Sequence, residues 1–202
     1  MVEVEKKFLL SDTQKTQLLD GAEFLYEKTI VDTYFDDTQF SLTANNLWLR
    51  ERDNEFELKA PLSTGSGAHQ ITNRFHEITV EAEIATELGM TYDDSLSTEL
   101  ARRGIAGFVT CHTLRISYAK DGFTIDVDSA SFDDTHFTHS VAEIELLVEE
   151  EAQADAAEVR ILNFAQEHGL NSDGVILGKI AAYLLNEKPQ HYKTLVEANV
   201  FK

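Results

Sequence analysis

The sequence has little cysteine, few basic residues and no long apolar run. Its 202 residues contain one cysteine, Cys111, which excludes an intrachain disulfide and a thiolate-rich metal cluster. Lysine and arginine together number 17 against 36 acidic residues, which gives a formal net charge of -19. This balance argues against nucleic acid or an anionic membrane surface as a partner, because both reward clustered basic side chains.

The lack of a long apolar segment also bears on location. No stretch approaches the roughly 18 apolar residues of a membrane-spanning helix, and the N-terminus lacks the basic stretch and apolar run of a signal peptide. These features predict a cytoplasmic protein without a membrane partner. With 43% hydrophobic residues, the chain can form one domain with a sizeable core. We therefore expect a single domain over residues 1–202, and a monomer.

What is present is a series of segments in which apolar and polar residues alternate, as they do in β-strands. These segments cover residues 2–9, 24–34, 46–52, 56–60, 71–80, 108–119, 123–128 and 140–148. Helices are expected at residues 11–19, 82–88, 96–103 and 190–198, and over 151–187 with a break near 169–174. Residues 61–70 read as a loop, and Asp121-Gly122 as a tight hairpin turn. The pattern predicts an α+β fold dominated by antiparallel strands.

Charged side chains recur on one face of these strands. In EVEKKF the alternation puts Glu3, Glu5 and Lys7 on one face, opposite Val4 and Phe8. If only one strand had this pattern, an antiparallel sheet with one face on the core and the other in water would explain it. Other strands, however, carry like charges two residues apart, which repel each other. These are the pairs Arg50/Arg52, Asp126/Asp128 and Glu143/Glu145.

Like-charge pairs are tolerated when a group of opposite charge lies between them. Acidic pairs suit a metal ion, and basic pairs suit a polyanion. If the sheet curls so that these faces point inward, it forms a channel with a basic side and an acidic side. Mg²⁺ takes carboxylate and phosphate oxygens together, and arginine binds phosphate through two hydrogen bonds. The ligand that such a channel would suit is a complex of a cation with a triphosphate.

The segment EVEKK, residues 3–7, resembles the Glu-x-Glu-x-Lys signature of the CYTH superfamily, the triphosphate tunnel metalloenzymes. Further segments resemble the animal-type thiamine triphosphatases within it. They are DTYFD (32–36), LWLRER (47–52), FELK (56–59), EIELLVEEEA (143–152), GKIAAYL (178–184) and KPQHYKTL (188–195). The resemblance implies an eight-stranded antiparallel β-barrel tunnel with flanking and C-terminal helices, which binds a small-molecule triphosphate together with Mg²⁺ or Mn²⁺.

The resemblance also implies a function for individual residues. The substrate would be bound by Lys7, Trp48, Arg50, Arg52, Lys59, Arg115 and Lys179. The metal would be held by Glu3, Glu5, Asp126, Asp128, Glu143 and Glu145. Lys59, Lys179 and Tyr34 would serve catalysis, because Tyr34 matches a tyrosine that steadies the active-site lysine. Trp48 matches a tryptophan that stacks on thiamine, whose cationic thiazolium and flat pyrimidine both suit an aromatic face.

Two details of the resemblance need comment. Phe75-His76 stands where the animal-type enzymes have Tyr-Lys, and FVTCHTLR, residues 108–115, allows two registers. One register puts Arg115 in the channel and the other His112. We prefer Arg115, because a fixed cation suits phosphate better than a half-neutral imidazole. Glu57 and Glu77 are expected to pair with basic residues rather than to bind metal.

These features predict a Mg²⁺-dependent hydrolase that removes the terminal phosphate of thiamine triphosphate. Three alternatives remain: a triphosphatase of inorganic or broader specificity, a non-catalytic binder of triphosphates or nucleotides, and a class IV adenylyl cyclase of the same superfamily. A second metal, Glu5 or Asp126 could activate the water, and Lys59 or Lys179 could support the leaving diphosphate. Fold alone does not separate these functions.

Overall fold

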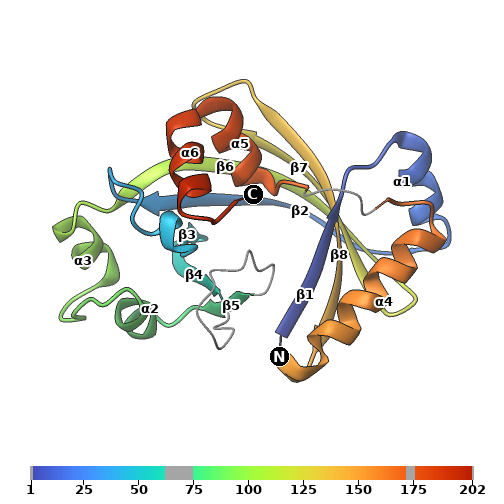
Figure 1. Cartoon of the computed structure of the whole chain (residues 1–202), viewed down its shortest axis with the longest axis horizontal. Helices are drawn as coiled ribbons and strands as arrows, with labels where there is room; N and C mark the ends of the chain where they lie inside the picture. The colour runs from blue at the N-terminus through green and yellow to red at the C-terminus, as the bar shows by residue number, and fades with distance from the viewer. Residues whose placement is uncertain (1, 62–74, 172–175, 202) are drawn as a thin grey trace. The chain divides into compact units, whose positions relative to one another are not determined.

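The structure is a computed structural model and describes residues 2–61, 75–171 and 176–201 (Figure 1). Eight strands form one sheet in the order β1-β8-β7-β6-β2-β3-β4-β5. Their bounds are β1 (Val2–Phe8), β2 (Glu23–Asp36), β3 (Trp48–Arg52), β4 (Glu55–Pro61), β5 (Phe75–Ile78), β6 (Ala106–Lys120), β7 (Phe123–Phe132) and β8 (Thr138–Val148). The α+β class and the eight antiparallel strands predicted from the sequence are confirmed. Residues 62–74, which hold most of the predicted loop and the start of the fifth predicted strand, lie outside the described residues.

The helices also lie where the sequence predicts them. They are α1 (Asp12–Leu19), α2 (Glu81–Glu87), α3 (Leu96–Arg102), α4 (Ala154–Glu167), α5 (Lys179–Glu187) and α6 (Pro189–Glu197), with the 3-10 helices η1 (Thr43–Asn45) and η2 (Glu151–Gln153). Ser11 caps α1 by accepting a hydrogen bond from the Gln14 amide, as a capping box requires. Across the described ranges, no helix is both long and apolar enough to cross a membrane.

The hairpin between β6 and β7 turns at Asp121 and Gly122. Both residues adopt positive φ, 52° and 83° respectively. A two-residue type I′ turn needs a positive φ at both central positions, and Asp-Gly is among the sequences that adopt it most readily. The predicted turn is therefore confirmed, and it fixes the end of a long antiparallel pair that carries several charged residues.

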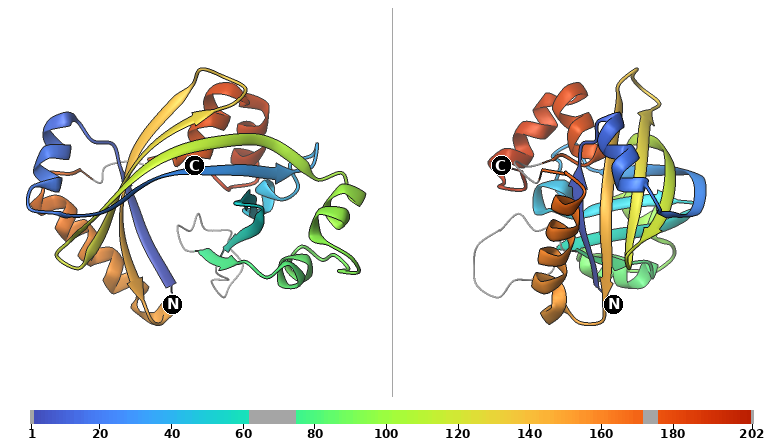
Figure 2. Two further views of the ribbon diagram at one scale, coloured as in Figure 1. Left: turned by 180° about the vertical axis from the view of Figure 1, so that it is seen from behind. Right: turned by 90° about the vertical axis from the view of Figure 1, so that its right-hand side faces the viewer.

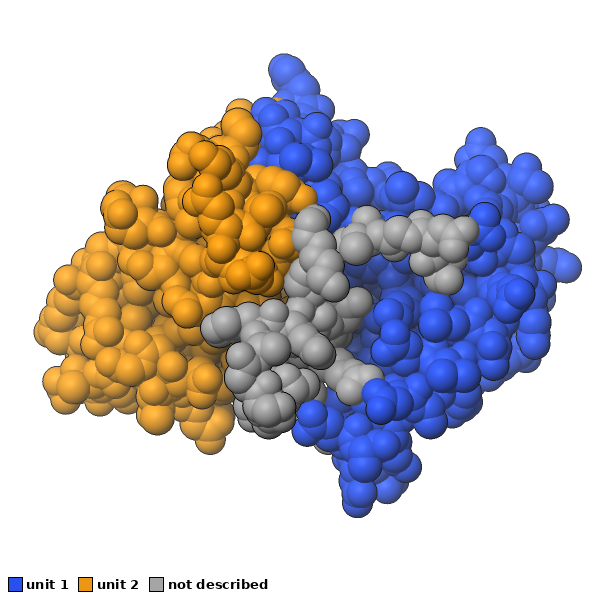
Figure 3. Space-filling model, in the orientation of Figure 1, with its two compact units in different colours: residues 1–30, 113–131, 136–187 blue, residues 31–112, 132–135, 188–202 orange. Residues whose placement is uncertain are grey.

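The chain divides into two compact units (Figure 3). Unit 1 comprises residues 1–30, 113–131 and 136–187, and unit 2 comprises residues 31–112, 132–135 and 188–202. Boundaries between the units fall within β2, β6 and β7. That the chain forms a single domain over 1–202 stays a prediction.

In unit 1, helix α4 packs along β1 and β8 (Figure 2). The core between them is made of the apolar positions of the alternating strands and one face of the helix. Its members include Val4, Phe8, Ile125, Ile144, Leu146, Ile161 and Phe164. Because side chains alternate across a strand, Glu3, Glu5 and Lys7 of β1 and Glu143 and Glu145 of β8 lie on the opposite face of the sheet. Lys6 is on the helix side, where it pairs with Glu158 of α4.

In unit 2, helices α2 and α3 cover one face of β3, β4 and β5. This core includes Leu49, Leu58, Ile78, Ile84, Leu96 and Leu100, all of them almost completely buried. Leu49 and Leu58 are partners across the β3–β4 pair. The alternation then places Trp48, Arg50 and Arg52 on the other face of β3. In each unit, therefore, burial of the apolar face determines which charged residues share the polar face.

Candidate metal and phosphate sites

The strand register of unit 1 brings carboxylates from three strands together. Glu5 pairs with Glu145 across β1 and β8, and Lys7 pairs with Glu143. On the far side of β8, Asp126 of β7 pairs with Glu143. Partners in antiparallel strands have Cβ atoms only about 5 Å apart on one face of the sheet. The register thus concentrates acidic side chains that are more than a hundred residues apart in the sequence.

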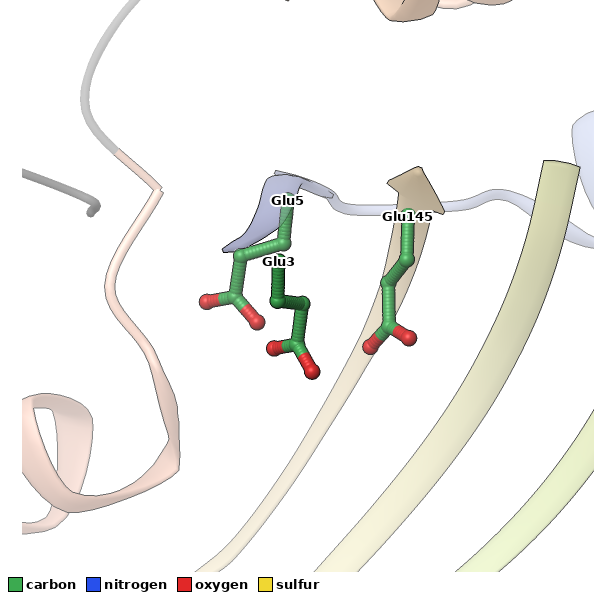
Figure 4. A group of neighbouring side chains, drawn as sticks. All are labelled: Glu3, Glu5 and Glu145. Atoms are coloured by element: carbon green, nitrogen blue, oxygen red, sulfur yellow. The ribbon is translucent and has the colours of Figure 1, made fainter. Parts of the chain in front are cut away.

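The carboxylates form two overlapping groups. Oxygens of Glu3, Glu5 and Glu145 all lie within 4.8 Å of one another, and so do oxygens of Asp126, Glu143 and Glu145. Figure 4 shows the side chains of the first group reaching the same region from β1 and β8. We call the five residues the acidic cluster. Its ligand atoms are all oxygens, the donor type that Mg²⁺ and Mn²⁺ prefer.

The acidic cluster is electrostatically unfavourable without a cation. Burial, together with the charges of Glu3, Asp126 and Glu143, raises the pKa of Glu145 to about 9. Burial also raises the pKa of Asp126 above its ordinary value. Oδ1 of Asp126 is fully buried, and no described residue gives it a hydrogen bond of normal geometry. A cation at this point would stabilise the ionised carboxylates and satisfy the open oxygen, so these residues fit a divalent metal.

Arg115 of β6 lies among the same carboxylates. Its Nε and one Nη lie 2.8 and 2.7 Å from the two carboxylate oxygens of Asp128, and that Nη is 2.8 Å from Glu143. The other Nη pairs with Asp126. Burial opposes the charge of Arg115, yet these partners raise its pKa above the ordinary value. Asp128, predicted as a metal ligand, is thus engaged at both oxygens by Arg115.

His112 belongs to unit 2 and contacts an aspartate. Its side chain is 42% exposed, and Nε2 lies 2.7 Å from a carboxylate oxygen of Asp133. Of the two registers open in FVTCHTLR, the structure has the one that brings Arg115 to the carboxylates. The predicted function of Arg115 in holding phosphate is a separate matter and stays a prediction.

Two of the predicted substrate-binding lysines, Lys7 and Lys179, also belong to unit 1. Lys7 pairs with Glu5, and its Nζ lies 3.2 Å from Glu143. Burial opposes its charge, but these two carboxylates raise the pKa of Lys7 above its ordinary value. Lys179, the first residue of α5, donates a hydrogen bond of 2.9 Å to the Thr113 hydroxyl. A Cβ on the preceding Gly178 would lie 3.2 Å from Lys7 Cε, so glycine permits the start of α5 to approach Lys7 closely.

Unit 2 holds the basic residues of β3, together with two carboxylates that face them. Arg52 donates to both oxygens of Asp32, at 2.7 and 3.1 Å. Arg50 pairs with Glu57, and its Nε lies 3.9 Å from the same Asp32. Burial opposes the charge of Arg50, but Tyr34, Glu57 and Asp32 raise its pKa above the ordinary value. Arg50 is therefore charged at any physiological pH.

Lys59 continues this group on β4. It is the partner of Trp48 in the β3–β4 register, and its Nζ lies 2.7 Å from Glu77. Burial tends to raise the pKa of Glu77, but Lys59 overrides it and lowers that pKa. The expectation that Glu57 and Glu77 pair with basic residues is confirmed. We call Arg50, Arg52 and Lys59 the basic row; Trp48 adjoins it.

The chain also matches a known protein family. The CYTH domain matches residues 1–176. The chain belongs to the CYTH family. It is similar to the thiamine-triphosphatase of Macaca fascicularis, with 30% identity over 217 residues that cover 100% of this chain and 92% of the macaque protein. The thiamine-triphosphatase of Homo sapiens is likewise 30% identical, over 98% of this chain and 91% of the human protein.

Solved structures show the same fold at lower identity. A candidate adenylate cyclase from Vibrio parahaemolyticus aligns with a TM-score of 0.57 and 18% identity, covering 89% of this chain and 96% of that protein. A candidate adenylyl cyclase from Hippeastrum, described as having a dominant triphosphatase activity, aligns with a TM-score of 0.55 and 17% identity, covering 90% and 94%. At these identities the comparison establishes the shared fold.

Sequence reasoning missed several residues of this CYTH protein that shape the two sets. Asp32 is completely buried and holds Arg52 in place, although the sequence analysis noted it only as part of DTYFD. Gly178 permits the close approach of α5 to Lys7. The sequence does contain an indication of Asp32, because it lies among apolar residues of a predicted strand. A carboxylate that becomes buried in such a strand needs a cationic partner. Which cation it meets depends on the β2–β3 register, where Asp32 pairs with Arg52.

Proposed function

We propose that this CYTH protein is a metal-dependent triphosphatase that hydrolyses thiamine triphosphate to thiamine diphosphate and phosphate. The observation that carries the proposal is the acidic cluster: carboxylates that repel one another, with a buried oxygen of Asp126 left open. A protein that only binds anions has no use for such a cluster. The relatives named thiamine-triphosphatase support the substrate, since they are 30% identical over nearly the whole chain.

In this proposal the two sets of residues act on different parts of the substrate complex. Glu3, Glu5, Asp126, Glu143 and Glu145 would hold Mg²⁺ or Mn²⁺. The bound ion supplies charge neutralisation to phosphate oxygens. The basic row binds phosphate oxygens directly, because a guanidinium donates two parallel hydrogen bonds to them.

Ion pairs within unit 2 orient the basic row for this task. Asp32 engages Arg52 from a fully buried position, so the guanidinium is oriented before substrate arrives. Glu57 and Glu77 pair with Arg50 and Lys59, and phosphate oxygens would compete with these carboxylates for the same hydrogen atoms. Preorganised cations lose little entropy on binding and stabilise charge that develops during phosphoryl transfer. Lys59 and Lys179 are the lysines available to stabilise the leaving diphosphate.

The test is phosphate release from thiamine triphosphate, inorganic triphosphate and ATP, each with Mg²⁺ and with EDTA. The proposal predicts the highest kcat/KM for thiamine triphosphate and no release in EDTA. Preference for inorganic triphosphate would favour the broader triphosphatase. Cyclic AMP and diphosphate from ATP would favour a cyclase, and binding without release of phosphate would favour a non-catalytic binder.

A further inference from the structure

Three aromatic rings of unit 2 lie next to one another, and two of them come from the C-terminal segment. The ring centroids of Tyr192 and Phe201 are 5.2 Å apart with an interplanar angle of 26°. Those of Phe201 and Trp48 are 6.0 Å apart at 29°. Both distances fall in the range of about 4.5–7 Å in which aromatic pairs attract. All three side chains are half-buried, so Phe201 covers part of the indole of Trp48 and is itself backed by Tyr192.

The position of Phe201 follows from how helix α6 ends. Asn199 adopts a left-handed conformation with φ of 58°, and the amide of Val200 donates to the Leu195 carbonyl at 2.8 Å. This is the hydrogen bond of a Schellman cap, which Asn accommodates better than most non-glycine residues. Leu195 is 0% exposed and Val200 is 7% exposed. The cap therefore turns the chain back and places Phe201 at the end of the helix.

Hydrogen bonds and ring stacking hold helix α6 and Trp48 in place. His191 is buried, its Nε2 lies 2.7 Å from the Thr43 hydroxyl, and its ring stacks on Phe40 at 3.8 Å. The indole nitrogen of Trp48 donates a 2.8 Å hydrogen bond to the Asn46 side chain. These contacts hold helix α6 and the indole of Trp48 in place.

The three rings adjoin the basic row. Trp48 pairs with Lys59 across β3 and β4, and it shares a face of β3 with Arg50, two residues along. A phosphate chain bound by the basic row would therefore bring an attached organic group close to the indole. Trp48 is half-buried, and Phe201 stacks on its indole, so a ligand would contact the part of the indole that Phe201 leaves exposed.

We propose that Phe201 and Tyr192 determine specificity, by backing Trp48 so that its open face forms a rigid platform for a planar, cationic organic group on the triphosphate. The assignment rests on the proposed function and extends it to residues of the C-terminal segment. A cation over an indole is attracted by the ring quadrupole, and a ring that is already fixed loses little entropy on stacking. Inorganic triphosphate has no group to place on the platform and gains nothing from it.

Intrinsic fluorescence tests this directly, because Trp48 is the single tryptophan of the chain. Wild-type protein and Phe201→Ala are titrated in EDTA, without turnover, with thiamine triphosphate, ATP and inorganic triphosphate. We expect the affinity of Phe201→Ala for thiamine triphosphate to fall roughly tenfold, with a smaller loss for ATP and a change of less than about twofold for inorganic triphosphate. In assays with Mg²⁺, the kcat/KM of Phe201→Ala should fall most for thiamine triphosphate, less for ATP and least for inorganic triphosphate.

Two further variants separate specificity from folding. Phe201→Tyr keeps an aromatic ring and should retain the wild-type affinities, whereas Tyr192→Ala should reproduce part of the Phe201→Ala loss. Phe24, an exposed phenylalanine of β2 that contacts Tyr118, provides a matched control, and Phe24→Ala should leave all three affinities unchanged. Thermal unfolding of each variant identifies any loss that comes from misfolding.

Two results would overturn the assignment. Equal losses on all three ligands would make Phe201 a purely structural residue. Tighter binding of thiamine triphosphate by Phe201→Ala would show that Phe201 occupies the place of the organic group. The outcome is independent of hydrolysis: absence of phosphate release with Mg²⁺ would refute the proposed function, whereas a selective loss of binding in EDTA would still support the platform.

Discussion

Asp32 and Arg52 form a two-point ion pair between neighbouring strands, with hydrogen bonds of 2.7 and 3.1 Å. The carboxylate is completely buried, while the Arg52 side chain remains 27% exposed. The pair therefore joins a buried anion to a cation that can still reach a ligand. This is the arrangement expected of an arginine whose orientation is set by the fold and whose charge is offered to phosphate.

Replacing Asp32 with Asn should reduce both stability and phosphate binding. The change removes the buried charge that pairs with Arg52 and one of the two acceptors of Arg52, while Arg50 keeps its pairing with Glu57. Breaking a buried pair costs about 3–5 kcal/mol. We expect denaturant unfolding to show a loss of about that size or somewhat less. Titration calorimetry should show weaker binding of inorganic triphosphate. Glu27→Gln, at an exposed position of the same strand, is the control, and an equal effect of the two changes would contradict the assignment.

The two arginines of β3 should behave differently when truncated. Arg50 is 8% exposed and pairs with Glu57, so Arg50→Ala leaves carboxylates without their partner and should destabilise the fold. Arg52 is more exposed, and Arg52→Ala should mainly weaken the binding of inorganic triphosphate, by about 1.5–3 kcal/mol for a charged hydrogen bond. Calorimetry and unfolding curves of the two variants check this. If Arg52→Ala binds inorganic triphosphate as tightly as wild type, the basic row is not a phosphate site.

Glu143 and Glu145 are neighbours in the acidic cluster but should differ in their effect on stability. Glu143→Gln removes a partner of both Lys7 and Arg115, so it should lower activity with Mg²⁺ and stability as well. Glu145→Gln relieves repulsion, and it should abolish most activity while leaving the metal-free protein as stable as wild type or more so. Phosphate release and urea unfolding of the two variants measure this. Near wild-type activity in both would contradict the metal site, and Glu149→Gln, at an exposed position beyond β8, is the control.

The metal-free protein should lose stability as pH rises. Burial and neighbouring acids raise the pKa of Glu145 from 4.5 to about 9 in the folded state. Below about pH 4.5 the group is protonated in both states, so its contribution to stability is fully present there. Between pH 4.5 and 9 the unfolded chain ionises while the folded protein does not, and the free energy of unfolding falls by at most about 1.4 kcal/mol per pH unit. Above pH 9 the loss is complete.

Urea unfolding in EDTA at several pH values between 5 and 9 measures this dependence. Because other groups titrate in the same range, the informative quantity is the difference between wild type and Glu145→Gln. The Gln variant should show a shallower decline in the free energy of unfolding as pH rises. Parallel curves would mean that Glu145 ionises normally in the folded protein.

The alternation of β1 illustrates how much of the candidate site can be predicted from the sequence of a single strand. Glu3, Glu5 and Lys7 share a face because a strand has a period of two, and the sequence is enough to predict it. The residues that they contact cannot be predicted from β1 alone, since Glu5 lies opposite Glu145 and Lys7 opposite Glu143 in a distant segment of the chain. That depends on the register between segments at the two ends of the chain, which the pattern within each strand leaves open. The resemblance to the CYTH superfamily supplied the grouping that the pattern could not.

Phe201 shows the opposite case. Its position depends on the left-handed cap at Asn199 and on the packing of α6, and nothing in the alternation of β3 indicates a ring beside Trp48. Arg115 lies between these extremes. The sequence allows two registers, one that places Arg115 among the carboxylates and one that places His112 there. Only the contacts of Arg115 with Asp126 and Asp128 decide between them.

The most direct test of the central claim is phosphorus NMR of thiamine triphosphate incubated with the protein. With Mg²⁺ the account predicts thiamine diphosphate and inorganic phosphate in equal amounts, no reaction in EDTA, and only a small fraction of the wild-type rate with Glu145→Gln. Release of diphosphate, or cleavage at an unchanged rate in EDTA, would contradict it.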